Sequence, residues 1–351
     1  MTAFATLPPN ERALVLTEAA GRLGLLPVIV EKDFWVCWIL ARLFEITAIA
    51  PHVVFKGGTS LSKVFGAIDR FSEDIDLAVH PQALGFAAAE LDDAPSVSAR
   101  RKRVVALEAA CARCVQERFR PALEAEIVDR LGSAPHGSPW LRYERDPVAD
   151  TPNLLFRYPS ALTLEGGYIA TQVTLEFGAL TSQQPTGGHR IEAMVTEALG
   201  LALTSAYDDL GARVVALAIT RTFWEKATIL HAEYHRPAAL PIRDRFARHY
   251  ADFEALWRHP SRADALARLD LLDDVVQHKH RYFASAWAHY DLAKPGTFRL
   301  TPPPSRRAAL ARDYATMAPM FRTAPIAFDA LLHRLEVAER QLNEGQSPDD
   351  V

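Results

Sequence analysis

Helical and strand-like periods alternate in the first part of the chain. Apolar residues recur at helical spacing over residues 10–24 and again over 28–46, which predicts two helices. Residues 100–132 are predicted to form one long helix with a break at Pro121. Short apolar runs between residues 139 and 180 have a period of two and predict strands. The first part of the chain is therefore expected to be an α/β unit.

From residue 207 onward the apolar positions keep the helical period. Residues 208–235 are predicted to form one helix, and further amphipathic helices follow up to residue 344. We therefore expect two domains: an α/β domain over residues 1–200, which begins with helices, and a helical subdomain over residues 201–351.

The stretch from residue 53 to 79 contains the most specific candidate chemistry. An apolar run leads to a Gly-Gly-Thr turn at 57–59, and a second run carries Asp74 and Asp76. Because side chains alternate along a strand, both aspartates project to the same side. Two carboxylates this close repel each other, and a divalent cation commonly neutralises such a pair. Glycines beside them let the backbone approach a phosphate closely. The stretch predicts a site where Mg²⁺ and a nucleoside triphosphate meet.

Nearby charged residues each have two interpretations. Lys56, Lys63 and Arg70 suit phosphate oxygens, but each is equally well explained as a partner that neutralises neighbouring acids. Farther along, Glu176 alternates with apolar neighbours and leaves their face. It either completes a three-carboxylate metal site with the two aspartates or lies in solvent.

Two charged helix starts are less specific. Glu31, Lys32 and Asp33 precede two tryptophans, and the composition favours buried tryptophans with the three charges in a solvated first turn. The densest basic cluster, residues 100–103, opposes the helix dipole at its position. That conflict leaves a phosphate-facing role open beside the simpler interpretation of a solvated face.

Composition limits the class of protein. With 351 residues, 49% of them hydrophobic, the chain can bury a sizeable core. The net charge of −4 gives no general basic character, so nucleic-acid binding requires a local patch. Cys111 and Cys114 lack a second ligand pair for zinc and are expected to be small buried residues. Three cysteines, with no signal-peptide or membrane-spanning pattern, predict a soluble cytoplasmic protein without a membrane partner.

A second polar group lies in the helical half. Lys226 ends a Trp-Glu-Lys segment, and Arg248, His249 and Asp252 share one side of a predicted helix. On the sequence pattern alone, an ordinary salt-bridge stripe along that helix is the stronger interpretation.

Several of these motifs resemble those of a known family. KGGTSLSKVF followed by RFSEDIDLAV is similar to the first motif of the AbiEii-type toxin nucleotidyltransferases. That family belongs to the DNA polymerase β-like nucleotidyltransferase superfamily and serves in type IV toxin–antitoxin systems and phage defence. The likeness extends to VEKDFWVCWIL, VTLEFGAL, RTFWEKATILHAEYHRP and RFARHYADF, which together span about residues 28–257. It implies an α+β fold: a small mixed β-sheet flanked by helices, with a C-terminal helical subdomain.

The resemblance also implies roles for individual residues. The catalytic residues would be Asp74, Asp76, Lys226 and Asp252, with Asp244 as a competing choice for the later acid. The nucleotide-binding residues would be Lys56, Gly57, Gly58, Thr59, Lys63, Arg70 and Ser72. The ligands of Mg²⁺, or of Mn²⁺ in its place, would be Asp74, Asp76 and Glu176.

The implied reaction transfers NMP from an NTP to an acceptor hydroxyl and releases pyrophosphate. RNA, and tRNA in the first place, is the expected acceptor, with residues 100–103 as a candidate acceptor surface. A cognate antitoxin is the implied partner. The alternatives are nucleotidyl or phosphoryl transfer to a protein or a small molecule such as an antibiotic, and a non-catalytic NTP-binding protein. The clustered aspartates and Lys226 argue against the last alternative.

Overall fold

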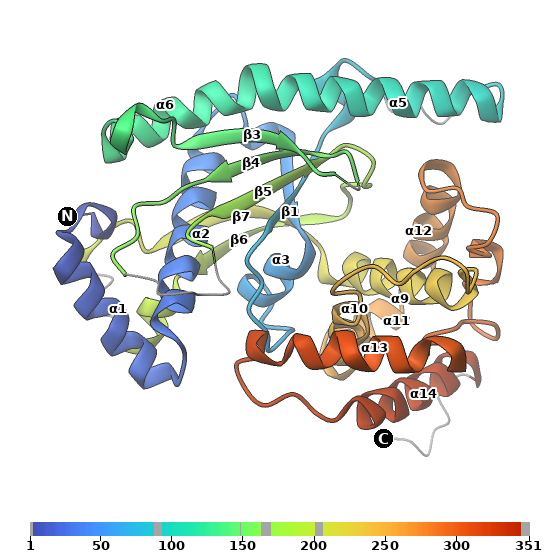
Figure 1. Cartoon of the computed structure of the whole chain (residues 1–351). Helices are drawn as coiled ribbons and strands as arrows, with labels where there is room; N and C mark the ends of the chain where they lie inside the picture. Colours follow the sequence, from blue (N-terminus) through green and yellow to red (C-terminus); the bar gives the residue numbers. More distant parts are fainter. Residues whose placement is uncertain (1–2, 88–92, 148, 163–169, 201–205, 345–351) are drawn as a thin grey trace. The chain divides into compact units, whose positions relative to one another are not determined.

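The computed structural model describes residues 3–87, 93–147, 149–162, 170–200 and 206–344 (Figure 1). The chain divides into two compact units. The N-terminal unit comprises Met1–Val64 and Ser72–Leu217, and the C-terminal unit comprises Phe65–Phe71 and Ala218–Val351. The chain therefore enters the C-terminal unit briefly at 65–71, returns to the N-terminal unit, and crosses finally at Ala218. The predicted domain boundary at residue 200 stays a prediction.

The N-terminal unit is built on one mixed β-sheet, which confirms the predicted α+β class. Within the described residues the strand order is β3-β4-β5-β2-β1-β7-β6. Strands β1–β7 and β2–β5 pair in parallel, and the remaining neighbours pair antiparallel. The strands are β1 (Val53–Lys56), β2 (Ile75–Val79), β3 (Leu141–Arg145), β4 (Pro152–Phe156), β5 (Val173–Gly178), β6 (Thr186–Glu192) and β7 (Gly211–Leu217).

The described helices of the same unit are α1 (Pro9–Leu23), α2 (Pro27–Glu45), α3 (Gly57–Lys63), α5 (Val97–Cys114), α6 (Arg120–Leu131) and α7 (Met194–Leu199). They pack on this sheet, except that α1 and α7 pack on α2 and on each other. The α2 side chains Trp35 and Trp38 pack on Phe156 of β4, with ring centroids 5.9 and 5.7 Å apart. Phe119, between α5 and α6, contacts Phe177 of β5 at 6.0 Å. All of these aromatic rings are buried and form much of the core.

The predicted long helix over 100–132 is confirmed, with a local irregularity. Figure 1 shows α5 and α6 as one extended helical arm along the sheet. The two are joined by a π-helical turn over Val115–Phe119, directly before Pro121. Proline supplies no backbone N–H, so the regular hydrogen-bond ladder changes there without ending the helix.

The prediction of a helix over residues 208–235 is wrong in its first third. Residues Gly211–Leu217 form strand β7, and helix α9 begins only at Ile219. In β7 the buried residues alternate with the exposed Arg213 and Val215, which is the period of a strand. The alanines of this run favour a helix locally, but pairing with β1 and β6 decides the outcome. Strand β6 was not predicted at all.

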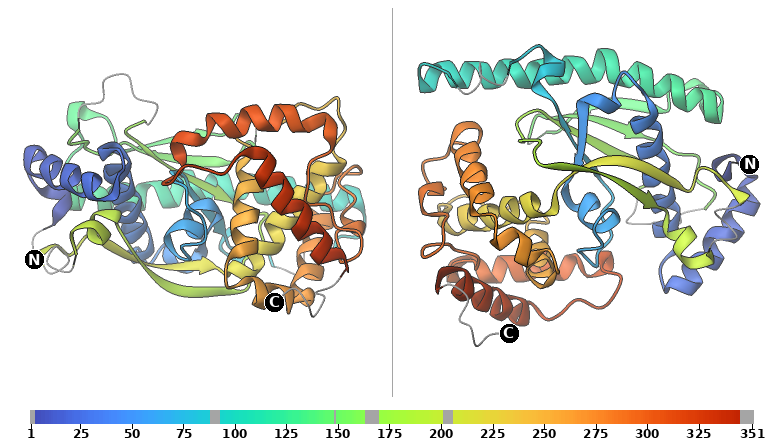
Figure 2. Two further views of the ribbon diagram at one scale, coloured as in Figure 1. Left: turned by 90° about the horizontal axis from the view of Figure 1, so that it is seen from below. Right: turned by 180° about the vertical axis from the view of Figure 1, so that it is seen from behind.

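The C-terminal unit consists mainly of helices, as predicted (yellow to red in Figures 1 and 2). They are α9 (Ile219–His235), α10 (Arg248–Arg258), α11 (Arg262–Leu266), α12 (Leu269–Tyr282), α13 (Pro304–Thr316) and α14 (Phe328–Glu344). Helix α9 is central because α10, α11 and α12 all contact it. Its Phe223 and Trp224 are fully buried and supply part of the core.

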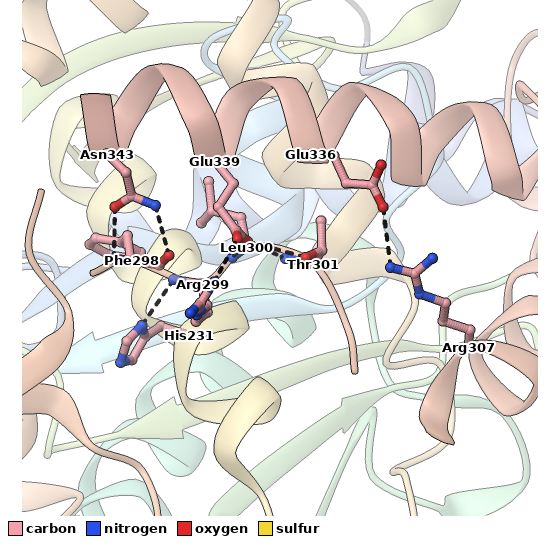
Figure 3. A network of polar contacts seen from close by, with 9 residues as sticks. All are labelled: His231, Phe298, Arg299, Leu300, Thr301, Arg307, Glu336, Glu339 and Asn343. Atoms are coloured by element: carbon pink, nitrogen blue, oxygen red, sulfur yellow. Dashed lines mark hydrogen bonds and ion pairs between the residues drawn. The ribbon is translucent and has the colours of Figure 1, made fainter. Parts of the chain in front are cut away.

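Helix α14 fastens an irregular segment onto α9 (Figure 3). Glu339 accepts hydrogen bonds from the backbone N–H groups of Leu300 and Thr301, at 2.6 and 3.1 Å. The residue before them, Arg299, donates its backbone N–H to Nδ1 of the buried His231 in α9, at 3.1 Å. The side chain of one α14 residue thus replaces the regular partners that this segment lacks.

No described helix is by itself long and apolar enough to cross a membrane. Helices α1 and α2 reach that length and apolarity only as a pair, across a bend of 110°.

Candidate active site

The first motif has a glycine, Gly57, at a position where any side chain would overlap the carboxylate of Asp76. Strand β1 ends at Lys56, and α3 begins at once with Gly57. Gly57 has φ +80°, and a Cβ on it would lie 1.9 Å from Oδ2 of Asp76. The Asp76 carboxylate therefore lies directly against the backbone of the turn. This close approach is the physical reason for glycine at this position.

Strand register aligns four polar residues in one row across the sheet. Lys56 of β1 is opposite Asp76 of β2, Asp76 is opposite Glu176 of β5, and Glu176 is opposite Asn153 of β4. Residues opposite each other project from the same face, and these four lie on the face away from the aromatic core. Lys56 Nζ is 3.9 Å from Asp76 Oδ1, with 21% and 30% of the two side chains exposed. The predicted position of Glu176 off the apolar face is confirmed.

The remaining residues of the motif are held by internal hydrogen bonds. The buried Thr59 hydroxyl donates to the backbone carbonyls of Ser72 and Asp74. Ser60 Oγ donates to the carbonyl of Gly57 at 2.9 Å. Asp74 lies just before β2 and is partly exposed. Thr59 thus ties the segment 72–74 to α3, which fixes the backbone that leads into Asp76.

The expectation that Glu31, Lys32 and Asp33 lie in a solvated first turn is wrong. All three are buried, with 0–3% of each residue exposed. Helix α2 packs inside the unit from its first turns, so charges there must find partners. Lys32 Nζ donates to Oε2 of Glu73 at 2.5 Å, next to Asp74 in the chain. The predicted burial of the two tryptophans is confirmed.

Lys63 is likewise an internal partner. Its ammonium donates to both oxygens of Asp33, at 2.7 and 2.9 Å, and 9% of the side chain is exposed. Burial lowers the pKa of Lys63, but the Asp33 charge outweighs this, and the pKa is raised above its ordinary value. Asp33 also accepts from the backbone N–H of Met194 at 2.6 Å. Lys63 therefore fastens α3 to α2. The signal that sequence reasoning missed is a run of three charges inside a helix that is apolar on all sides.

In the C-terminal unit, Asp252 joins two cations that are far apart in the sequence. Arg70 donates Nε to Oδ1 and Nη2 to Oδ2 of Asp252, at 2.7 and 2.9 Å. Lys226 of α9 donates to the same Oδ2 at 2.7 Å. Asp252 is 1% exposed. Burial raises the pKa of Asp252, but the two cations lower it well below its usual range. The interpretation of Asp252 as part of a salt-bridge stripe along its own helix is therefore wrong.

The segment that carries Arg70 is held by backbone contacts within the same unit. Phe71 donates its N–H to the carbonyl of Met320 at 2.7 Å, and Arg322 donates to the carbonyl of Asp69 at 3.2 Å. Arg70 itself forms an isolated antiparallel bridge with Phe321. These contacts orient the guanidinium that clamps Asp252.

His249 completes the surroundings of Lys226. Its Nδ1 lies 3.0 Å from Lys226 Nζ. Burial lowers the pKa of His249 well below its ordinary value, and the charges of Lys226 and Arg248 lower it further. Burial also lowers the pKa of Lys226, although Asp252 opposes the shift. The competing acid Asp244 lies in the exposed turn before α10, so the structure pairs Lys226 with Asp252.

Carboxylate oxygens are the ligands that Mg²⁺ prefers, so Asp76 and its neighbour Glu176 suit such a cation chemically. Within the described ranges, however, no group of three or more His, Cys, Asp or Glu side chains is arranged to hold a metal ion. The three-carboxylate site therefore stays a prediction. Of the other candidates, Arg101 and Lys102 are exposed on the first turns of α5, and Cys111 and Cys114 are buried thiols, as predicted.

Comparison with known proteins identifies the family. Residues 38–334 match the family described as "Nucleotidyl transferase AbiEii toxin, Type IV TA system". A search of curated proteins found no match. Among solved structures, the chain is similar to MenT4, a nucleotidyltransferase toxin from Mycobacterium tuberculosis H37Rv. The identity is 18% and the TM-score 0.46, and the likeness covers 96% of this chain and 91% of MenT4. Because the family match spans residues 38–334, which is most of the chain, the chain belongs to the AbiEii nucleotidyltransferase toxins of type IV toxin–antitoxin systems.

Proposed function

We propose that this protein is a Mg²⁺-dependent enzyme that transfers NMP from an NTP to an RNA acceptor, in the first place tRNA. The observation that carries the proposal is the placement of Asp76 beside Glu176, with the Asp76 carboxylate against the glycine turn. Family membership supplies the reaction class. The metal and the acceptor are the parts that experiments must test.

Asp74, Asp76 and Glu176 are the residues proposed to hold Mg²⁺, with Mn²⁺ as a substitute. A cation bound there would neutralise phosphate charge and lower the pKa of the attacking hydroxyl. Gly57 supports this assignment because its lack of a side chain lets the Asp76 carboxylate lie against the backbone of the turn.

The phosphates of the NTP are proposed to bind the backbone of Gly57 and Gly58 and the ammonium of Lys56. Lys56 is partly exposed and ends the strand beside Asp76. Thr59 and Lys63 support this turn from inside, because both are engaged in internal hydrogen bonds. Lys226 is proposed to contact the nucleotide phosphates as a second cation. Asp252 keeps that cation charged and in place, because it is buried and already accepts from Arg70 and Lys226.

The direct test is incorporation of label from each α-labelled NTP into total RNA in the presence of Mg²⁺. We expect label in tRNA with the wild-type protein and loss of at least 100-fold with Asp74→Ala, Asp76→Ala or Glu176→Gln. Glu144→Gln is the matched control, because Glu144 faces Asn153 in the same row but on the outer strand β3. Full incorporation by the Asp74 and Asp76 variants would overturn the mechanism, and label in protein alone would redirect the acceptor.

The toxin role is tested in cells. Expression of the protein in the cytoplasm should arrest growth of the cells, and the product of the neighbouring antitoxin gene should restore growth. The three free, buried cysteines fit a reducing compartment. An enzyme that modifies a drug would cause no arrest, so sustained growth with an active enzyme would refute the toxin role.

A further inference from the structure

The ammonium of Lys226 is held by two different kinds of acceptor. Lys226 is 7% exposed. It donates to Oδ2 of Asp252 at 2.7 Å and lies 3.0 Å from Nδ1 of His249. Both partners belong to α10, one turn apart, while Lys226 belongs to α9. Among the described residues these are its hydrogen-bond partners.

The second contact fixes the chemical state of the histidine. A lysine ammonium has three N–H donors and no acceptor, so Nδ1 of His249 must accept and carries no hydrogen. The single ring hydrogen of neutral His249 is therefore on Nε2. The charges that act on the ring are Lys226, Arg248 and Arg70, which disfavour its protonation, and Asp252, which favours it. Together with burial they keep the ring neutral, so the acceptor persists at physiological pH.

Two cations share the carboxylate of Asp252, so Asp252 alone does not cancel the charge of Lys226. Arg70 and Lys226 each contribute +1, and Asp252 contributes −1. Neutral His249 engages an N–H of Lys226 without cancelling that charge, whereas a second carboxylate at this position would cancel it. Two of the three N–H groups of Lys226 are thus directed, and the third is left for an anion.

We propose that His249 is a positioning residue: its unprotonated Nδ1 orients the Lys226 ammonium so that the remaining N–H is directed at the nucleotide phosphates. The inference rests on the proposed phosphate contact of Lys226. It replaces the sequence interpretation, in which His249 lies in a salt-bridge stripe along its own helix. In the structure His249 pairs with a cation, which only a neutral ring can do.

The test compares two substitutions of similar size. In His249→Asn the side-chain oxygen lies near the place of Nδ1 and can accept, whereas His249→Leu offers no acceptor. We expect His249→Leu to weaken binding of a non-reacting α,β-methylene NTP by about 10-fold or more, since the Lys226 ammonium then loses a charge-assisted hydrogen bond. Its KM for NTP should rise accordingly. His249→Asn should stay within about three-fold of wild type in both measurements.

The outcomes separate this inference from the proposed function. If Lys226→Met binds and turns over NTP like wild type, the phosphate role of Lys226 fails, and the inference fails with it. If Lys226→Met is impaired but His249→Leu is not, or if His249→Asn is impaired as much as His249→Leu, the inference alone fails. The ¹⁵N shifts of the His249 ring in the wild-type protein give a readout that needs no variant. We expect an unprotonated Nδ1 at pH 7, and a protonated Nδ1 would overturn the inference.

Discussion

Replacing Gly57 by alanine perturbs the site at one atom. The new Cβ would lie 1.9 Å from Oδ2, 2.6 Å from Cγ and 2.9 Å from Cβ of Asp76, all below the 3.0 Å that real Cβ atoms keep. Rotation of the Asp76 side chain can remove the first two overlaps but not the third, because Cβ does not move in that rotation. The carboxylate must therefore leave its position, and β1 and β2 must also separate slightly.

Two effects of different size follow. The left-handed backbone at φ +80° costs an alanine about 1–2 kcal/mol of stability. The carboxylate oxygen must move by about 1 Å or more, and a misplacement of about 1 Å at a reacting centre can lower the rate about 100-fold. Gly57→Ala should therefore lose far more activity than its modest loss of stability explains.

Gly24→Ala is the matched control. Gly24 ends α1 in the same unit with φ +65°, and a Cβ on it would meet nothing within 4 Å. It should lose a similar amount of stability, about 1–2 kcal/mol, in urea unfolding. Its nucleotide incorporation should stay at the wild-type level, measured at saturating NTP and at a temperature at which both variants are folded. Full activity of Gly57→Ala would refute the assignment of Asp76 to the site. Equal loss of activity in both variants would show that backbone strain, and not contact with the carboxylate, is responsible.

Two further changes test other parts of the structure. Lys32→Met removes the charge-assisted hydrogen bond between the buried Lys32 ammonium and Glu73 and should lower the free energy of unfolding by about 1.5–3 kcal/mol. Arg22→Met, in an exposed pair on α1, should change it by less than about 1 kcal/mol. Equal effects of the two variants in urea titrations would contradict the burial argument. Burial lowers the pKa of His231 to about 4 in the folded protein, from about 6.5 in the unfolded chain. Below pH 6.5 the unfolded chain therefore binds more protons than the folded protein. Lowering the pH from 7 to 5 should then reduce the free energy of unfolding by about 2 kcal/mol through this residue. His231→Asn should flatten that pH dependence of urea unfolding while His333→Asn, on an exposed part of α14, should not, and an unchanged slope would refute the assignment.

The predictable parts of the structure are those set by local pattern. Helical spacing located α1 and α2 to within a residue or two, and the alternation around Glu176 placed it off the apolar face. The glycine turn and the two aspartates were found because the first motif is continuous in sequence. In these places local propensity and the final fold agree.

The rest depends on contacts that no local pattern encodes. Strand β7 was mistaken for helix because its alanines favour a helix locally, and pairing with β1 and β6 overrides that preference. For Lys63 and Arg70 the sequence pattern left open whether they bind phosphate or neutralise neighbouring acids, because the pattern does not show which acids lie beside them. Their partners, Asp33 and Asp252, lie 30 and 182 residues away along the chain. Sequence reasoning named these residues but could not connect them.

The brief passage of residues 65–71 through the C-terminal unit has a consequence for synthesis. This segment finds its partners at Asp252 and at Met320 to Arg322, close to the end of the chain. Ribosomes add about 5–20 residues per second, so roughly 10–50 s pass between the emergence of Arg70 and that of Met320. Throughout that interval the segment lacks the backbone partners that Met320 and Arg322 supply. A nascent chain released before Met320 is made should therefore lack the nucleotidyltransferase activity. The toxic effect on the cell would then begin only when synthesis has passed these late partners of residues 65–71.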